Sequence, residues 1–458
     1  MLTPQWIAKT THGKLVRAEP SAIRGFSIDS RTIQPGQIFL ALKGPNHNGH
    51  HYLDEVFARG ALGAVIDEGF YGKSTPHPNL IIVNNVQKAL HDMARAYRKL
   101  FQMPLVGITG SVGKTTTKDL AGQMLQTRLK TYYSPGNHNN EIGLPLSLVN
   151  MPLGTEVGVF ELGTQQPGEL KPIADLLGPS IGVITAIADA HRGFFESEEA
   201  LAQEKWSIIE ALPLAGGIAI LNADTPCLRA KSTTQRFRVE FGIKRTAATY
   251  RAVDIVDKGL EGLAFTLVHP SGSLPMTSPL LGRHNIYNIL AAISISMEMR
   301  VDVHAIQEVV ANFWASPHRL ERKASRLGII LDDCYNASPS AVKAAVSTFS
   351  QIETQKNKVF VFGDMNELGA ESLNYHQQVA SWVKDAGFTQ IFTLGDMAAE
   401  TARTLQKKHG WLPNQIQIAR SMDELEAHIK GSLKEEDNLI LVKGSRSMAL
   451  DQLVDHLE

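Results

Sequence analysis

The sequence predicts an α/β fold in three domains: a small N-terminal α/β unit, a central unit with a mostly parallel sheet and helices on both faces, and a C-terminal Rossmann-like unit. Three observations support this. The 458 residues suffice for three domains, at a typical size of about 150 residues each. Apolar runs of strand length alternate with helical spacing, the pattern of parallel sheets covered by helices. A glycine-rich segment, residues 107–117, separates a strand-like run from a helical one.

The composition is that of a globular protein, with 43% hydrophobic and 20% charged residues. A formal net charge of −1 argues against a broad nucleic-acid or membrane surface. Cys227 and Cys334 have no metal-ligand spacing and are interpreted as reduced thiols. The N-terminus does not resemble a signal peptide, and no apolar run is long enough to span a bilayer. We therefore expect a cytoplasmic monomer that binds neither nucleic acid nor membrane.

The N-terminal domain, residues 1–84, contains three runs that read as short strands. They are residues 37–42, 64–66 and 80–83. The segment 86–101 then places its apolar residues on one helical face.

The central domain, residues 85–315, is predicted to carry the parallel sheet. Its strand-like runs are residues 105–108, 157–160, 181–184 and 215–221, and its helices are residues 118–125, 198–212 and 282–300. Residues 246–280 are β-branched and rich in turns, which favours antiparallel strands there.

The C-terminal domain, residues 316–458, shows four further strand-like runs separated by helical stretches. They are residues 329–331, 359–362, 391–394 and 439–442. Ser338 and Pro339 form a good helix start, with serine as N-cap and proline at the first helical position. A second doubly wound unit is expected.

The glycine-rich segment reads as a phosphate-binding loop. Backbone N–H groups of such a turn, together with the following helix N-terminus, face an anion. We expect Lys114 to reach the β- and γ-phosphates and the Thr115 hydroxyl to bind Mg²⁺. The strict pattern G-x-x-x-x-G-K-[ST] is not met, because Ile108 occupies its first position. The predicted ATP-binding residues of the loop are Gly110, Ser111, Val112, Gly113, Lys114, Thr115 and Thr116.

Two residues after central strands are candidate metal ligands. Glu161 follows residues 157–160, and His191 follows the run that ends at residue 184. Ligands of open α/β sheets bind beyond the carboxyl ends of the strands, and a carboxylate suits Mg²⁺. A solvated acid and a structural histidine are the alternatives. Lys205, on the helix 198–212, is a solvated lysine unless CO₂ converts it to a carbamate, which offers oxygen ligands.

Six further residues are candidates for nucleotide binding. Asn285 and Asn288 share a helix face, and their amides can pair with an adenine edge, although Asn285 can instead cap the helix. Arg319 can neutralise phosphate charge, and Asp333 can bind a ribose. The set is Asn285, Asn288, Arg319, Asp333, Tyr335, which can stack on a base, and Asn336.

With these motifs in view, the chain resembles the Mur ligases, the ATP-dependent amide-forming enzymes of peptidoglycan synthesis. Thr109–Thr116 matches their loop form T-G-[ST]-x-G-K-T-T, which also accounts for Ile108. The likeness continues through residues 136–145, Glu161, His191 and Lys205, and resumes at residues 282–288, 318–319 and 333–339. It spans nearly the whole chain, including the three-domain layout.

Within the family, residues 363–369 and 442–448 are most similar to the member that adds D-alanyl-D-alanine to UDP-N-acetylmuramoyl-tripeptide. Residues 29–31, 41–44 and 48–50 resemble a uridine-binding domain. Asn48 stands where an aspartate is usual, and Met365-Asn366 departs from the usual M-L-E-L-G form, so neither position is assigned a role.

The resemblance implies that ATP phosphorylates the tripeptide carboxylate and that the amine of D-alanyl-D-alanine attacks the acyl phosphate. It implies one Mg²⁺ on Thr115 and Glu161 and a second on His191 and carbamylated Lys205. Lys114, Lys205, His191 and Glu161 are the expected catalytic residues. The expected UDP-substrate residues are Ser30, Arg31, Lys43, Asn137 and Asn140. Closure of the C-terminal domain is expected to complete the ATP site.

Another Mur ligase, the one that forms the tripeptide, is an alternative, although the sequence lacks the D-N-P-R-type stretch expected in it. Three further functions remain open at this point. A folylpolyglutamate synthase is a relative with similar loop chemistry, although that enzyme starts close to its phosphate loop. A GTPase or ATPase switch calls for a base-specificity motif such as N-K-x-D, which the sequence lacks. A catalytically silent nucleotide-binding protein is the third.

Overall fold

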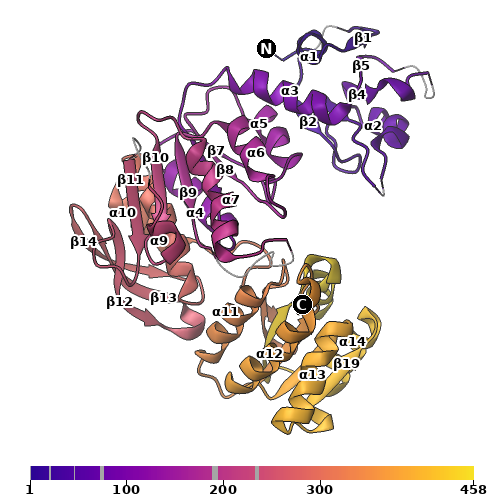
Figure 1. Cartoon of the computed structure of the whole chain (residues 1–458). Helices are drawn as coiled ribbons and strands as arrows, with labels where there is room; N and C mark the ends of the chain where they lie inside the picture. The colour runs from indigo at the N-terminus through magenta and orange to yellow at the C-terminus, as the bar shows by residue number, and fades with distance from the viewer. Residues whose placement is uncertain (1, 20–21, 46, 73–76, 188–193, 233–236) are drawn as a thin grey trace.

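Three β-sheets, each with its own helices, follow one another along the chain. The computed structural model describes residues 2–19, 22–45, 47–72, 77–187, 194–232 and 237–458. In Figure 1 the indigo N-terminal part, the magenta central part and the orange-to-yellow C-terminal part form a crescent. The α/β fold class is thereby confirmed.

The first sheet has the order β1-β5-β4-β3-β2 and is parallel except for β1, which pairs antiparallel with β5. Its elements, with the helix that follows, are α1 (Pro4–Thr11), β1 (Lys14–Val16), β2 (Gly25–Ser27), β3 (Gln37–Leu40), α2 (Leu53–Ala58), β4 (Gly63–Asp67), β5 (Leu80–Val83) and α3 (Val86–Arg98).

The second sheet has the order β14-β13-β12-β11-β10-β9-β6-β8-β7, and only the two pairings among β12, β13 and β14 are antiparallel. Its elements are β6 (Leu105–Thr109), α4 (Lys114–Gln126), β7 (Thr131–Tyr133), α5 (Gly143–Val149), β8 (Val157–Glu161), α6 (Leu170–Leu177), β9 (Ile181–Ile184), α7 (Glu198–Glu210), β10 (Ile218–Asn222), α8 (Pro226–Arg229), β11 (Phe237–Gly242), β12 (Tyr250–Asp257), β13 (Leu263–His269), β14 (Gly272–Ser278), α9 (His284–Glu298) and α10 (Val303–Asn312).

The third sheet has the order β15-β16-β20-β17-β18-β19, with only β15 antiparallel to its neighbour. Its elements are β15 (Glu321–Ser325), β16 (Gly328–Asp332), α11 (Pro339–Ser350), β17 (Asn357–Gly363), α12 (Ser372–Asp385), β18 (Gln390–Leu394), α13 (Asp396–His409), β19 (Ile416–Ala419), α14 (Met422–Ser432), β20 (Asn438–Lys443) and α15 (Leu450–Leu457).

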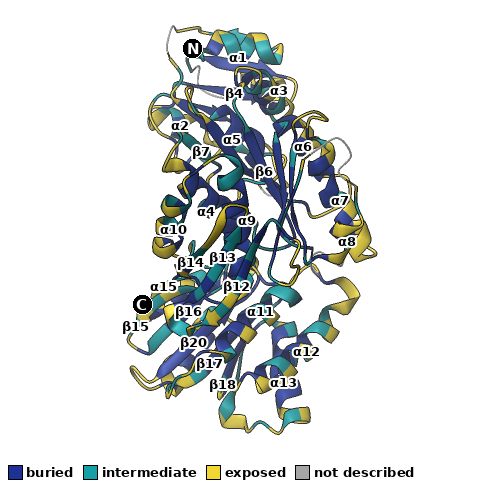
Figure 2. Cartoon of the chain, turned by 90° about the vertical axis from the view of Figure 1, so that its left-hand side faces the viewer, coloured by how far each residue is buried: buried dark blue, intermediate teal, exposed yellow. Residues whose placement is uncertain are grey.

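The inner strands of all three sheets are buried on both faces. Every residue of β6, β8 and β9 is buried, and Figure 2 shows the sheets in dark blue beneath helices whose outer faces are yellow. Continuous apolar runs are what a strand covered on both faces requires. The ends of β6 and β8, from which the phosphate loop and Glu161 emerge, are therefore fixed by packing.

The sequence-based boundaries differ from the structure at particular points. The helix predicted at residues 118–125 begins four residues earlier, at Lys114, directly after the glycine turn. The strand predicted from residue 215 begins at Ile218, because Gly216 adopts φ +83° in a turn. Our domain boundaries after residues 84 and 315 fall between sheets and remain a proposal. None of the described helices is long and apolar enough to cross a membrane.

Candidate functional site

A cleft of about 780 Å³ lies where the central and C-terminal domains meet. The central domain contributes the phosphate loop, the loop after β7 and the start of α9, and the C-terminal domain contributes the turn between β16 and α11. Of the predicted residues, the cleft is lined by Ser111, Val112, Gly113, Lys114, Thr115, Thr116, Asn137, Asn140, Glu161, Asn285, Asn288, Arg319, Asp333, Tyr335 and Asn336.

Two glycines give the phosphate loop its shape. Gly113 adopts φ +85°, and a Cβ there would stand 2.1 Å from Asn288 Oδ1. Gly110 adopts φ +154°, and a Cβ there would stand 2.0 Å from Thr185 Oγ1. The Thr185 hydroxyl donates to the Val112 carbonyl at 2.6 Å. Neither position has room for a side chain, which explains the glycines physically.

Lys114, the first residue of α4, reaches back over the loop. Its ammonium donates to the Gly110 carbonyl at 2.8 Å and to the Ser111 carbonyl at 3.4 Å. Burial lowers the pKa of Lys114, the Glu161 carboxylate raises it, and the charge of Arg319 lowers it. The two hydrogen bonds hold the Lys114 side chain over the loop, where the phosphates of a nucleotide would bind.

Thr115 and Glu161 meet at the carboxyl end of the central sheet. The Thr115 hydroxyl donates to Glu161 Oε2 at 2.6 Å, and the Asn139 amide donates to Oε1 at 2.7 Å. Glu161 is only 2% exposed. A buried hydroxyl and carboxylate in contact form a hard-oxygen donor set, which fits Mg²⁺.

Arg319 connects the two domains at this point. Its guanidinium donates to Thr115 Oγ1 at 2.8 Å and lies over the Tyr335 ring, 4.1 Å from the ring centroid. Because Arg319 belongs to the segment that leads into β15, the C-terminal domain supplies a cation directly to Thr115 at the end of the loop.

The two asparagines of α9 lie side by side, as their spacing predicted. The Asn288 amide donates to Asn285 Oδ1 at 2.8 Å, and the Asn285 amide donates to the Leu281 carbonyl at 2.8 Å. Both residues are buried, and both line the cleft. Asn285 does not cap the helix, because its side chain donates to a preceding carbonyl and the N-cap position is Arg283, which forms no side-chain cap.

In the C-terminal domain, a buried lysine organises the turn after β16. Lys443 Nζ donates to Asp333 Oδ2 at 2.5 Å and to the Asn336 carbonyl at 3.1 Å. Lys443 is 2% exposed and ends β20, the neighbour of β16. The ion pair holds Asp333 at the wall of the cleft.

Lys205 is not a solvated lysine. It lies on α7 with 1% of its surface exposed. Burial lowers the pKa of its amine well below the usual value, the charge of Lys114 lowers it further, and Glu204 and Glu161 oppose the shift. The interior position thus favours the neutral amine. His191, predicted as a metal ligand, lies outside the described residues.

The predicted UDP-substrate residues divide between two places. Asn137 and Asn140 line the cleft, whereas Ser30, Arg31 and Lys43 belong to the N-terminal domain and do not line it. Arg31 is exposed and forms an ion pair with Asp29 at 2.7 Å.

Asn48, to which the sequence assigned no role, lies beside His50. Its Oδ1 is 2.7 Å from His50 Nδ1, and His50 Nε2 accepts a hydrogen bond from the backbone amide of Asp67 at 2.9 Å. Burial lowers the pKa of His50. The amide at position 48 therefore supports a neutral histidine inside the N-terminal domain.

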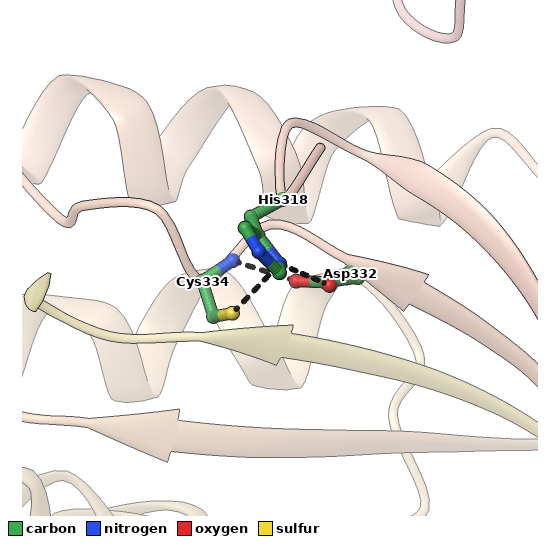
Figure 3. A group of neighbouring side chains, drawn as sticks. All are labelled: His318, Asp332 and Cys334. Carbon is green, nitrogen blue, oxygen red and sulfur yellow. Dashed lines mark hydrogen bonds and ion pairs between the residues drawn. The ribbon is translucent and has the colours of Figure 1, made fainter. Parts of the chain in front are cut away.

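His318, the residue before Arg319, forms a compact group with Asp332 and Cys334 (Figure 3). His318 Nδ1 is 2.7 Å from Asp332 Oδ2 and 3.8 Å from Cys334 Sγ. The Asp332 carboxylate also accepts the Cys334 amide at 3.1 Å, and Lys323 Nζ stands 3.7 Å away. Burial and the Asp332 carboxylate raise the pKa of the Cys334 thiol, which disfavours the thiolate that a metal ion would need. We therefore interpret this group as an anchor for the backbone that carries Arg319.

Residue-based reasoning missed three site residues: Asn139, Thr185 and Lys443. Asn139 and Lys443 lie within the segments 136–145 and 442–448 that carried the resemblance, which was the available signal. For Thr185 and Lys443, the partners are 73 and 110 residues away in sequence. Their contacts follow from strand order, which the sequence does not display.

Comparison with known proteins gives consistent results along the chain. The family described as "Mur ligase middle domain" matches residues 108–296, and "Mur ligase, glutamate ligase domain" matches residues 318–446. The UDP-N-acetylmuramoyl-tripeptide–D-alanyl-D-alanine ligase of Bacillus subtilis (strain 168) is 31% identical over 98% of this chain and 97% of its own. The enzyme of that name from Escherichia coli (strain K12) is 33% identical over 94% of this chain and 92% of its own. A crystal structure of MurF from Acinetobacter baumannii matches with a TM-score of 0.84 and 25% identity, over 99% of this chain and 98% of that one.

Proposed function

This chain belongs to the Mur ligase family, and we infer that it joins D-alanyl-D-alanine to UDP-N-acetylmuramoyl-tripeptide in an ATP-dependent reaction. The product is UDP-N-acetylmuramoyl-pentapeptide, a precursor of peptidoglycan. The relatives that carry this name match the N-terminal domain as well as the other two, because they cover 94–98% of the chain. That coverage disfavours a folylpolyglutamate synthase, which starts close to its phosphate loop.

One observation carries the chemical side of the proposal. The Thr115 hydroxyl contacts both the Glu161 carboxylate, at 2.6 Å, and the Arg319 guanidinium, at 2.8 Å. Two oxygen groups that suit Mg²⁺, from Thr115 and Glu161, thus lie beside the Arg319 guanidinium of the C-terminal domain, at the loop that would bind the ATP phosphates. This arrangement suits transfer of a phosphoryl group, where charge on the transferred oxygens must be neutralised.

The reaction needs an activated carboxyl group. A carboxylate oxygen of the tripeptide attacks the γ-phosphorus, the bond to the β-γ bridging oxygen breaks, and ADP leaves. The amine of D-alanyl-D-alanine then attacks the acyl carbon, phosphate leaves with the former carboxylate oxygen, and the nitrogen loses a proton. We propose that Lys114 and Arg319 neutralise the two anions as they approach, and that Asn285, Asn288, Asp333, Tyr335 and Asn336 hold the nucleotide.

Mg²⁺ would be held by Thr115 and Glu161, where it would shield the charge of the phosphates. We propose a second Mg²⁺ site on His191 and a carbamylated Lys205. In that modification the neutral amine of Lys205 attacks CO₂, an N–C bond forms, one C=O electron pair moves to oxygen, and nitrogen releases a proton. The interior position of Lys205 and its lowered pKa support this step, because only an unprotonated amine reacts.

The UDP-linked substrate would extend from the cleft toward the N-terminal domain. We propose that Asn137 and Asn140 contact it near the reacting carboxyl group and that Ser30, Arg31 and Lys43 contact its uridine end. The need for ATP and the free thiols of Cys227 and Cys334 support a cytoplasmic location.

The decisive experiment measures phosphate release with ATP, Mg²⁺ and D-alanyl-D-alanine. UDP-N-acetylmuramoyl-tripeptide is compared with the corresponding dipeptide and with a folate acceptor. We expect release with the tripeptide alone, and its loss in the variant Lys114→Ala. Lys171→Ala, which removes an exposed lysine of the same domain, is the control and should retain full activity. Release with folate or dipeptide but not with tripeptide would overturn the proposal.

A further inference from the structure

Lys118 is a buried lysine to which the mechanism proposed above assigns no role. It lies one turn after Lys114 on α4, with 1% of its surface exposed. Its ammonium donates to the Ser134 carbonyl at 2.6 Å and to the Gly136 carbonyl at 3.0 Å. Asp119 Oδ1 is 2.9 Å away, so the buried charge is also paired. Burying an ammonium is costly unless such partners satisfy it.

The carbonyls that Lys118 holds begin the loop between β7 and α5, residues 134–142. This loop lines the cleft with Asn137, Asn139 and Asn140. Asn139 donates to Glu161, and its carbonyl accepts the Gly163 amide at 2.7 Å. Asn140 Oδ1 accepts the Gly143 amide at 2.8 Å at the start of α5. Hydrogen bonds to β8 and α5 thus hold the later part of the loop, and the hydrogen bonds of Lys118 on α4 hold its beginning.

Asp119 extends the same connection to the C-terminal domain. Its Oδ2 accepts the Ser316 hydroxyl at 2.7 Å, and Ser316 lies three residues before Arg319 in the segment between α10 and β15. The second turn of α4 therefore contacts two segments. Lys118 contacts the loop 134–142, and Asp119 contacts the segment between the central and C-terminal domains. The first turn of the same helix contains Lys114 and Thr115.

We propose that Lys118, with Asp119 as its counter-ion, is a positioning residue that sets the acceptor loop 134–142 relative to the phosphate loop. The proposal rests on the function inferred above and adds to it a residue that touches neither substrate nor nucleotide. A fixed spacing between the two loops matters because the tripeptide carboxylate must meet the γ-phosphate at reacting distance, and small misplacements reduce rates strongly.

The test compares Lys118→Met with wild type and with Lys171→Met, which removes an exposed lysine of the same domain that pairs with Asp175. We expect Lys118→Met to lower kcat/KM for UDP-N-acetylmuramoyl-tripeptide by about a hundredfold, the scale of a misplacement of about 1 Å. Affinity for ADP without Mg²⁺ should fall much less than kcat/KM, because Lys118 donates to the carbonyls of Ser134 and Gly136 and not to the phosphate loop. Lys171→Met should change neither quantity.

Two additions separate positioning from loss of fold. Lys118→Arg retains charge and donors and should recover at least part of kcat/KM, and Lys118→Gln replaces Lys118→Met if the latter does not fold. Hydrogen exchange of residues 134–142 should be faster in the variants than in wild type. The proposal would be overturned if kcat/KM for the tripeptide substrate and the affinity for ADP fell by the same factor. Unchanged hydrogen-exchange rates of residues 134–142 would also overturn it. Absence of turnover by wild type would instead reject the proposed function, and the exchange measurement would still test Lys118.

Discussion

At the scale of single residues, the site depends on a few polar atoms that each serve two partners. The Thr115 hydroxyl contacts Glu161 and Arg319, and the Glu161 carboxylate accepts from Thr115 and Asn139. These groups are buried or half-buried, where hydrogen bonds to charged groups are strong and unpaired ones are costly. A small displacement of any one of them therefore affects the others.

Lys205 offers the sharpest prediction at this scale. Lys205→Ala should lower activity by about a hundredfold or more, because a ligand of the proposed second metal site and a buried polar group are both lost. Short carboxylic acids should restore part of the activity by supplying the missing carboxylate. The rates of wild type and variant are measured with and without added acid. Arg98, a half-buried arginine of the central domain, serves as a control in the form Arg98→Ala, which the acids should not rescue. Full activity of Lys205→Ala without acid would reject the carbamate.

At the scale of elements, strands with a continuous apolar run could be predicted, whereas strands without one could not. β6, β8 and β9 are apolar throughout because helices cover both of their faces. β1 and β7 have three residues each and none of them is buried, so they carry no apolar signal. Thr115 and Glu161 could be found from their places after strands. The contacts of Asn139 and Lys443 could not be predicted, because they depend on which segments fold against each other, although both residues lie in segments that carried the resemblance.

The contact between the phosphate loop and α9 gives a prediction at the scale of elements. Gly113→Ala should lower both thermal stability and ADP affinity, since a Cβ would stand 2.1 Å from Asn288 Oδ1. Backbone strain at positive φ costs about 1–2 kcal/mol by itself. Gly216→Ala is the matched control, because Gly216 has φ +83° but no atom within 4 Å of the added Cβ.

Calorimetric unfolding and ADP titration of both variants separate strain from collision. Gly113→Ala should lose more stability than Gly216→Ala, and Gly216→Ala should bind ADP normally. Adding Asn288→Ala should recover part of the stability lost in Gly113→Ala. Equal destabilisation in the two glycine variants would show that the contact with Asn288 plays no part.

At the scale of the whole molecule, the proposed nucleotide site is shared by two domains, and Leu281 of the central domain packs into the core of the C-terminal one. Lys114 and Thr115 come from the central sheet, and Asp333 and Asn336 come from the turn after β16. Arg319 and the contact of Ser316 with Asp119 join the domains beside the cleft. A ligand that contacts both walls would therefore stabilise the arrangement in which they face each other across the cleft, because that arrangement offers both sets of contacts.

This arrangement predicts that a nonhydrolysable ATP analogue with Mg²⁺ slows hydrogen exchange in two separate segments, residues 110–118 and 333–341. At a ligand concentration of 100 times the dissociation constant, binding adds about 2.7 kcal/mol to the stability of the bound state. Amides that exchange only after the ligand leaves should then exchange about a hundredfold more slowly. Residues 63–67, which form β4 in the N-terminal domain, serve as the internal reference and should not change. Protection confined to residues 110–118 would mean that the C-terminal domain does not take part in nucleotide binding, and the roles proposed for Asp333 and Asn336 would fall.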